Sequence, residues 1–154
     1  MILSIDVDNA HWRELPELKQ LTRAAVLAAA DEIGKVHDDL ELAILFTDDE
    51  RMAHLNTEWR NKSGATNVLS FPAEDFPLPA GEPKPLGDIV LAEGVVTGEA
   101  LQQGKTLPQH LSHLIIHGFL HLAGYDHEND REAQAMEELE IAIMKKLGFP
   151  NPYE

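Results

Sequence analysis

Three histidines near the C-terminal end of the chain are spaced so that they can bind one metal ion. His117 and His121 are four residues apart, so on a helix their rings project from the same face, with Cβ atoms about 6 Å apart. Gly124 is the residue type that ends helices in a left-handed conformation, and it lets His127 turn back toward the same ion. The spacing therefore predicts a site with three imidazole ligands and one open coordination position.

An open site of this kind indicates hydrolytic chemistry. Catalytic zinc sites combine three protein ligands with a water, whereas structural sites fill all four positions, usually with thiolates. The chain has no cysteine, which excludes thiolate ligands. A bound ion could bring the pKa of its water toward neutrality and polarise an oxygen of the substrate. We expect one Zn²⁺ per chain, although imidazole ligands also suit copper, iron and nickel.

The residue after the first histidine argues against a peptidase. The stretch HGFLHLAGYDH has the spacing of the metzincin pattern H-E-x-x-H-x-x-G-x-x-H. The glutamate of that pattern acts as the general base, and Gly118 stands in its place. The acid, the base and the group that stabilises charge must therefore come from other parts of the chain.

Other polar residues nearby could support the site. His113 lies four residues before His117 and offers a rival ligand pair. That pairing would leave His121 and the glycine bend without a role, so we place His113 behind the ligands rather than among them. Two carboxylates are further candidates. Asp126 either orients an imidazole or faces solvent, and Asp88 either supports the site or bonds to nearby backbone at a strand edge.

Three stretches of the chain closely resemble the YbeY family of bacterial metal-dependent endoribonucleases. They are LNTEWRNKSGATNVLSFP (55–72), LGDI (86–89) and HGFLHLAGYDH (117–127), and the resemblance extends over nearly the whole chain. It implies a single-domain α/β fold and a zinc-type ion held by the three histidines. It also implies single-strand-specific cleavage of ribosomal RNA in 16S rRNA 3′-end maturation, and a role in ribosome quality control.

The resemblance also bears on two residues outside the histidine cluster: one matches a family motif and the other departs from it. Arg60 matches the arginine of the family's L-N-x-x-[YW]-R motif, and its planar guanidinium suits neutralising charge that develops on a phosphate. Asn67 departs from the family, because many relatives carry aspartate in the segment here written TNVLSF. If that carboxylate has a chemical role in the relatives, this chain lacks it here, although an asparagine can still position a neighbour by hydrogen bonds.

Length and composition fit one domain over residues 1–154. A chain of 154 residues can bury about 70% of the surface that its unfolded form exposes. No apolar run approaches the roughly 18 residues that a membrane helix needs. The chain opens on an alternating strand pattern rather than on a signal peptide. We therefore expect a cytoplasmic protein without a membrane partner.

The net charge of −15 is opposite to the basic surface expected of a nucleic-acid binder. The middle third is less acidic, since residues 51–112 carry five basic and seven acidic groups. A phosphate-facing cleft would draw on this segment and on the charge of the metal itself. The acidity also favours docking on a basic ribosomal protein, which could deliver the RNA.

Apolar patterning predicts an α/β (α+β) fold, with a small mixed sheet of four strands covered by about five helices. Strands are expected at Ile2–Val7, Leu40–Phe46, Asn67–Phe71 and Asp88–Ala92. Helices are expected at about Pro16–Ile33, from a capping box at Thr47 to Arg60, and at Glu93–Gln103, Leu107–Leu122 and Asp130–Leu147. Five of the nine prolines fall between Pro72 and Pro85, which predicts a long loop there.

We predict a metal-dependent endoribonuclease whose partners are rRNA and the small ribosomal subunit or its proteins. Two alternatives remain open. One is a ribosome-assembly factor in which the metal only stabilises structure, and the other is a different metallohydrolase. A cleft that reaches from the metal site to Arg60 would favour the enzyme.

Overall fold

The computed structural model describes residues 1–73 and 83–154, and one mixed sheet organises this part of the chain. The strand order is β1 (Ile2–Val7), β2 (Leu40–Thr47), β4 (Lys84–Ala92) and β3 (Val68–Pro72). β1, β2 and β4 run parallel, whereas β3 pairs antiparallel with β4 and forms one edge of the sheet. The α/β class and the mixed four-stranded sheet predicted above are confirmed.

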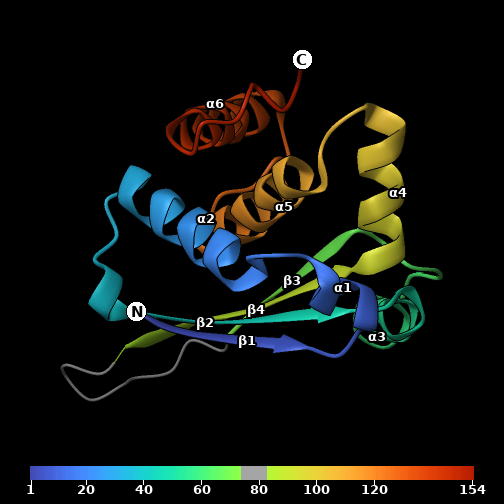
Figure 1. Cartoon of the computed structure of the whole chain (residues 1–154). Coiled ribbons are helices and arrows are strands. Elements are labelled where there is room, and N and C mark those ends of the chain that lie inside the picture. Colours follow the sequence, from blue (N-terminus) through green and yellow to red (C-terminus); the bar gives the residue numbers. More distant parts are fainter. Residues whose placement is uncertain (74–82) are drawn as a thin grey trace.

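Helices pack on both faces of the sheet, and one face carries more of them than the other (Figure 1). On one face lie α2 (Leu18–Glu32) and α5 (Leu107–Leu122), and α6 (Asp130–Lys146) packs on top of them. On the other face lies α3 (Asp49–Arg60), while α4 (Glu93–Gln103) leads from β4 to α5. The end of α5 comes close to the edge strand β3, and this is where the predicted metal ligands lie.

The larger core lies between the sheet and the helix pair α2 and α5. Side chains of a strand alternate between its two faces, and β2 is buried at every second residue from Leu40 onward. The core side chains are large, apolar and fully buried, and they include Leu42, Ile44, Ile89, Leu91, Leu111, Ile115 and Phe119. A smaller cluster on the opposite face packs Met52 of α3 against Leu69 and Val90.

Several boundaries differ from the predicted ones because tertiary pairing decides them. β4 begins at Lys84 rather than Asp88, since its first residues pair with β2 beyond the end of β3. α3 is capped by Asp48 rather than Thr47, which still belongs to β2. α2 begins at Leu18 after the left-handed Glu17, not at Pro16.

Two short helices were not predicted. These are α1 (Ala10–Glu14) and the 3₁₀ helix η1 (His37–Asp39), and each is too short to show a periodic pattern. The long loop predicted between Pro72 and Pro85 falls mainly on residues 74–82, which lie outside the described residues.

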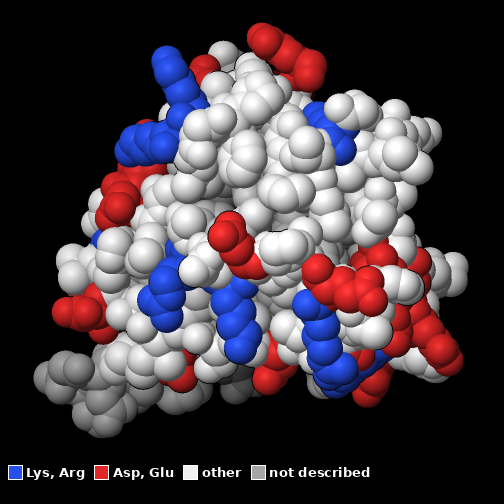
Figure 2. Space-filling model, in the orientation of Figure 1, with Lys and Arg blue, Asp and Glu red and all other residues white. Residues whose placement is uncertain are grey.

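The surface carries charges of both signs. In Figure 2 the acidic side chains are densest at the lower right of the view, near α1 and α3, while basic side chains are spread among acidic ones elsewhere on this face. Among the described residues, no helix combines the length and the apolar character that crossing a bilayer would require.

Candidate metal centre

The side chains of His117, His121 and His127 converge at the C-terminal end of α5. One ring nitrogen from each lies within 4.8 Å of the other two, and the Nε2 atoms of His117 and His121 are 3.1 Å apart. Two nitrogens that bind one zinc tetrahedrally at about 2.0–2.1 Å would be about 3.3–3.4 Å apart. The residues present therefore fit a divalent ion held by three imidazoles.

The turn after α5 brings the third histidine toward the first two. Gly124 has a φ of 104°, and its N–H donates to the carbonyl of His121 at 3.0 Å. The N–H of Tyr125 donates to the carbonyl of Leu120 at 2.9 Å. This pair of bonds is a Schellman motif, which ends a helix with a left-handed residue. A residue with a side chain would be strained at this φ, so the bend needs glycine.

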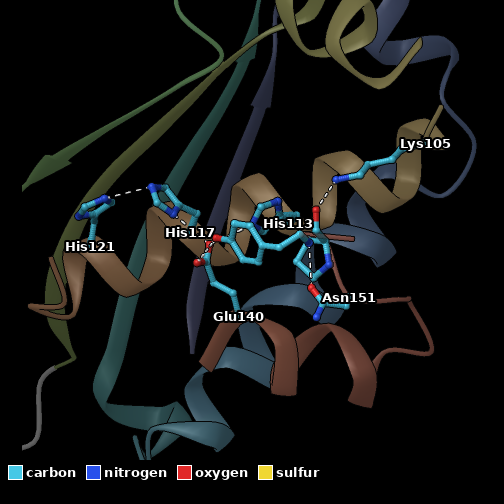
Figure 3. Close-up of polar contacts among 8 residues, drawn as sticks. Lys105, His113, His117, His121, Glu140 and Asn151 are labelled. Atoms are coloured by element: carbon cyan, nitrogen blue, oxygen red, sulfur yellow. Dashed lines mark hydrogen bonds and ion pairs between the residues drawn. The ribbon is translucent and has the colours of Figure 1, made fainter. Parts of the chain in front are cut away.

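A buried carboxylate holds the ring of His117. Glu140 on α6 is only 1% exposed, and its Oε1 accepts hydrogen bonds from Nδ1 of His117 at 2.9 Å and from Nε2 of His113 at 3.0 Å (Figure 3). A proton on Nδ1 leaves Nε2 of His117 as a bare lone pair directed at His121, which is the tautomer that a metal requires. The structure therefore places His113 beside Glu140 and not in the ligand cluster.

Glu140 is ionised in this environment. Burial raises the pKa of its carboxyl, but the hydrogen bonds from His113, His117 and Tyr153 outweigh burial and lower the pKa to about 2. A buried negative charge directly behind a ligand imidazole increases the basicity of that imidazole toward a cation. Glu140 thus supports the candidate metal centre through His117 and is not one of its three candidate ligands.

Sequence reasoning missed Glu140, although the sequence contains a signal for it. The buried face of α6 consists of Met136, Glu140, Ile143 and Met144, which have the i, i+4, i+7, i+8 spacing of an apolar stripe. One glutamate interrupts that stripe. A buried charge must be paired or hydrogen-bonded, so its position in the stripe predicts a partner on a neighbouring element.

Glu140→Gln is expected to weaken metal binding by about tenfold or more, the loss typical when the partner of a ligand imidazole is changed. The neutral amide is a poorer hydrogen-bond acceptor than the carboxylate. Its NH₂ group would also face the N–H and O–H groups that now donate to the carboxylate, and two donors cannot bond to each other. Competition with a chromophoric chelator would measure the Zn²⁺ affinity. Glu138→Gln is the matched control, because Glu138 lies on the same helix but is exposed. Equal affinities for Glu140→Gln and Glu138→Gln would contradict a role for Glu140.

Metal binding is expected to weaken as the pH falls. Burial, followed by the charges that His117 and His127 carry when protonated, lowers the pKa of His121 below its usual 6.5. Only the neutral imidazole binds metal, so protons compete below the pKa, and a lowered pKa moves this competition to more acidic conditions. We expect a metal titration between pH 7.5 and 5 to show affinity falling below about pH 6. Constant affinity across that range would rule out histidine ligation.

A cavity of about 720 Å³ opens beside the three histidines. Arg60, the last residue of α3, lines the same cavity, so the cleft does reach from the histidines to the predicted arginine. Arg60 is exposed, and within residues 1–73 and 83–154 no partner holds its guanidinium. It is therefore available to bind an anionic group that enters the cavity.

Asn67 lines the cavity, but its amide bonds elsewhere. Its Nδ2 donates to Glu99 at 3.0 Å, and its Oδ1 accepts from the N–H of Val68 at 2.6 Å. Glu99 also bonds at 2.9 Å to Nε2 of His110, which is buried. Asn67 thus ties the start of β3 to α4. An aspartate here would place a second carboxylate against Glu99, so an asparagine suits this contact.

The remaining carboxylates lie on different sides of the sheet. Asp126 lines the cavity, where it accepts from the N–H of His127 at 2.8 Å and so supports the turn. Asp88 instead lines a second cavity of about 470 Å³, together with Trp59. Its neighbour Ile89 faces α5, so alternation along β4 turns Asp88 to the opposite face. Of the two alternatives left open for Asp88, support of the histidines does not agree with this placement.

Gly118 lies where α5 packs closely against the sheet. A Cβ atom at this position would lie 3.0 Å from Oγ of Ser70 and 3.2 Å from the side chain of Ile89. Ser70 Oγ also donates to the carbonyl of Gly118 at 3.3 Å. A glutamate in this position would therefore be directed at β3 and β4, which agrees with the absence of a metzincin-type base.

The fold and the site together define a class of protein: a mixed α/β protein with an open three-histidine metal site and an arginine in the same cavity, as metal-dependent hydrolases have. The comparisons with known proteins agree. The family described as Endoribonuclease YbeY matches residues 6–148. Endoribonuclease YbeY of Bartonella bacilliformis is 49% identical over 98% of this chain and 96% of its own length. That of Azorhizobium caulinodans is 45% identical, over 99% and 96%.

The chain therefore belongs to the YbeY family of endoribonucleases, and the resemblance found in the sequence is confirmed. A solved structure has a similar fold. The solution structure of TM1509 from Thermotoga maritima superposes with a TM-score of 0.60 and 22% identity, covering 96% of this chain and 92% of that one.

Proposed function

We propose that this protein is a zinc-dependent endoribonuclease that cleaves single-stranded ribosomal RNA. The observation that carries the proposal is that the three histidines and Arg60 line one cavity, in a member of an endoribonuclease family. A site that only stabilised structure would have no need of an open cavity beside the histidines, or of an arginine in its wall whose guanidinium binds none of the described residues.

In this proposal, some residues of the chain hold the ion and another binds the phosphate. When bound, a zinc ion supplies an activated water and polarises a phosphate oxygen. Glu140 keeps the Nδ1 proton on His117, so that Nε2 faces the ion. Arg60 binds the non-bridging oxygens of the phosphodiester and neutralises the charge that develops on them, because its guanidinium can bond two oxygens at once.

The charges inside the cavity explain how an acidic protein can bind RNA. The net charge of −15 acts over the whole surface, but salt screens exposed charges beyond about 8–10 Å. Within the cavity, the described residues that carry full charges are Arg60 and Asp126, and a divalent ion would make the local sum positive. The local field therefore favours a phosphate despite the net charge.

The edge of β3 is poorly suited to an extended peptide. Peptide substrates commonly add a strand to an exposed sheet edge. Asn67 and Ala73 bond to β4, so alternation turns the main-chain groups of Val68, Ser70 and Pro72 outward. The Val68 N–H already bonds to Asn67 Oδ1, and proline has no N–H. Among these outward groups only the N–H of Ser70 remains to donate, so a peptide could pair with this edge mainly through the carbonyl acceptors. This weakens the case for a peptidase.

Within this proposal, the substrate is the 3′ end of 16S rRNA, and cleavage serves ribosome maturation and quality control in the bacterial cytoplasm. The acidic surface near α1 and α3 (Figure 2) offers a docking area for a basic protein of the small subunit. The competing proposal is an assembly factor without turnover, in which the metal site is structural.

A substrate comparison tests the proposed activity. The zinc-loaded protein is expected to cleave a single-stranded RNA that spans the 16S rRNA 3′ end, and to leave the matching DNA, an RNA duplex and casein intact. Treatment with a chelator should stop cleavage, and added Zn²⁺ should restore it. A preparation of His121→Ala, purified in parallel, controls for contaminating nucleases. Hydrolysis of casein would favour a peptidase, and absence of cleavage by the zinc-loaded protein would favour the assembly factor.

A further inference from the structure

The C-terminal end of the chain reaches the metal centre through one tyrosine. The phenol of Tyr153 donates to Oε2 of Glu140 at 2.6 Å. The other oxygen of the same carboxylate, Oε1, accepts from His113 and His117. Figure 3 shows Glu140 between these histidines and the C-terminal segment that carries Asn151. All three donors thus meet on one buried carboxylate.

Contacts that involve no metal hold this tyrosine in place. Lys105, between α4 and α5, donates to the carbonyl of Pro152, and the N–H of Tyr153 donates to Oδ1 of Asn151 at 2.8 Å (Figure 3). The Tyr153 ring also meets the ring of His113 edge to face, with centroids 5.3 Å apart. None of these contacts uses one of the three candidate ligands, so they hold the tyrosine independently of the metal site.

The phenol decides how the Glu140 carboxylate can be oriented. The terminal torsion of a glutamate is broad and roughly two-fold, so hydrogen bonds must select its orientation. A donor at 2.6 Å is within the range of a short, charge-assisted bond to a carboxylate. Without the phenol, Oε2 of Glu140 would lose its hydrogen-bond donor, and Glu140 is only 1% exposed to water. Rotation of the carboxylate or entry of water would relieve that cost, and either would move Oε1 away from Nδ1 of His117.

We propose that Tyr153 is a positioning residue of the metal centre, which acts through Glu140 to orient the imidazole of His117. The inference rests on the proposed function in one respect, namely that His117 is a metal ligand. It does not depend on the substrate. The C-terminal segment, which lies far along the chain from the histidine motif, then contributes to metal affinity.

Tyr153→Phe tests the proposal, because it removes the hydroxyl and keeps the ring against His113. The zinc affinity of the full-length protein, measured by chelator competition at pH 7.5, is expected to fall by about three- to tenfold. This loss is smaller than the 10- to 100-fold typical of a direct partner of the ligand. The absorption spectrum of the Co²⁺-loaded protein should also change, because it reports the geometry of the ligands.

Tyr125→Phe is the matched control. Tyr125 lines the same cavity as Tyr153, but its hydroxyl has no bond to Glu140. The control should retain the wild-type zinc affinity and Co²⁺ spectrum. The melting temperatures of the metal-free proteins show whether either variant is unfolded.

The outcomes separate this inference from the proposed function. Wild-type zinc affinity and an unchanged Co²⁺ spectrum in Tyr153→Phe would overturn the positioning role, whatever the RNA assay shows. Weaker zinc binding in Tyr153→Phe alone, with melting temperatures near that of wild type, would support it even if the wild-type protein cleaved no RNA. An equal loss of affinity in Tyr153→Phe and Tyr125→Phe would also overturn it.

Discussion

His121→Ala is expected to lose most of its bound metal and, with it, all RNA cleavage. Nε2 of His121 lies 3.1 Å from Nε2 of His117, so its removal leaves two ligands, one of them on an exposed turn. Two imidazoles cannot form the three-ligand site that a catalytic ion needs. Elemental analysis of the purified variant, with zinc titration by chelator competition, measures the loss.

His113→Ala is the control for this experiment, since it removes an imidazole from the same helix that bonds to Glu140 rather than to the cluster. It should keep a stoichiometric ion. Retention of a full ion by His121→Ala would refute the ligand assignment. A loss in His113→Ala as large as that in His121→Ala would restore the rival pairing of His113 with His117.

Arg60→Ala is expected to cut RNA cleavage by at least about tenfold and to leave metal content and melting temperature near wild type. A tenfold loss corresponds to about 1.4 kcal/mol, and one group that stabilises developing charge in the transition state can contribute about 2.7 kcal/mol or more, roughly 100-fold. Arg60 is exposed and holds no other described residue in place, so its removal should not affect folding. Steady-state cleavage of a single-stranded RNA measures the effect.

Arg60→Lys should restore only part of the activity, because an ammonium cannot make the two-point contact of a guanidinium. Arg131→Ala, on the exposed part of α6, controls for the loss of one positive charge from the protein. Equal cleavage rates for wild type and Arg60→Ala would remove this arginine from the mechanism.

Local patterns were sufficient to predict most of the fold. Strands with alternating burial, such as β2, and helices with caps or glycine stops show their character over a few residues. The boundaries failed where partners distant in sequence intervene. β4 extends back to Lys84 because β2 lies beside it, and no local signal in a proline-rich segment could indicate that pairing.

The ligand cluster could be predicted for the same reason, since helix geometry alone brings His117 and His121 together and Gly124 bends the chain back. The roles of residues outside that segment were harder to assign. The sequence could not reveal which face of the sheet Asp88 would occupy, because a strand pattern has two faces and only packing distinguishes them.

The sequence by itself determined the three candidate metal ligands, the α/β class and the family, because each depends on spacing within one segment or on similarity along the chain. The tertiary structure alone decided what surrounds the metal site. It brings Arg60 of α3 into the cavity of α5 and places Glu140 of α6 behind His117. It also bonds Tyr153 to that carboxylate. These contacts join residues 13 to about 60 positions apart, which only the packing of helices on the sheet can bring together.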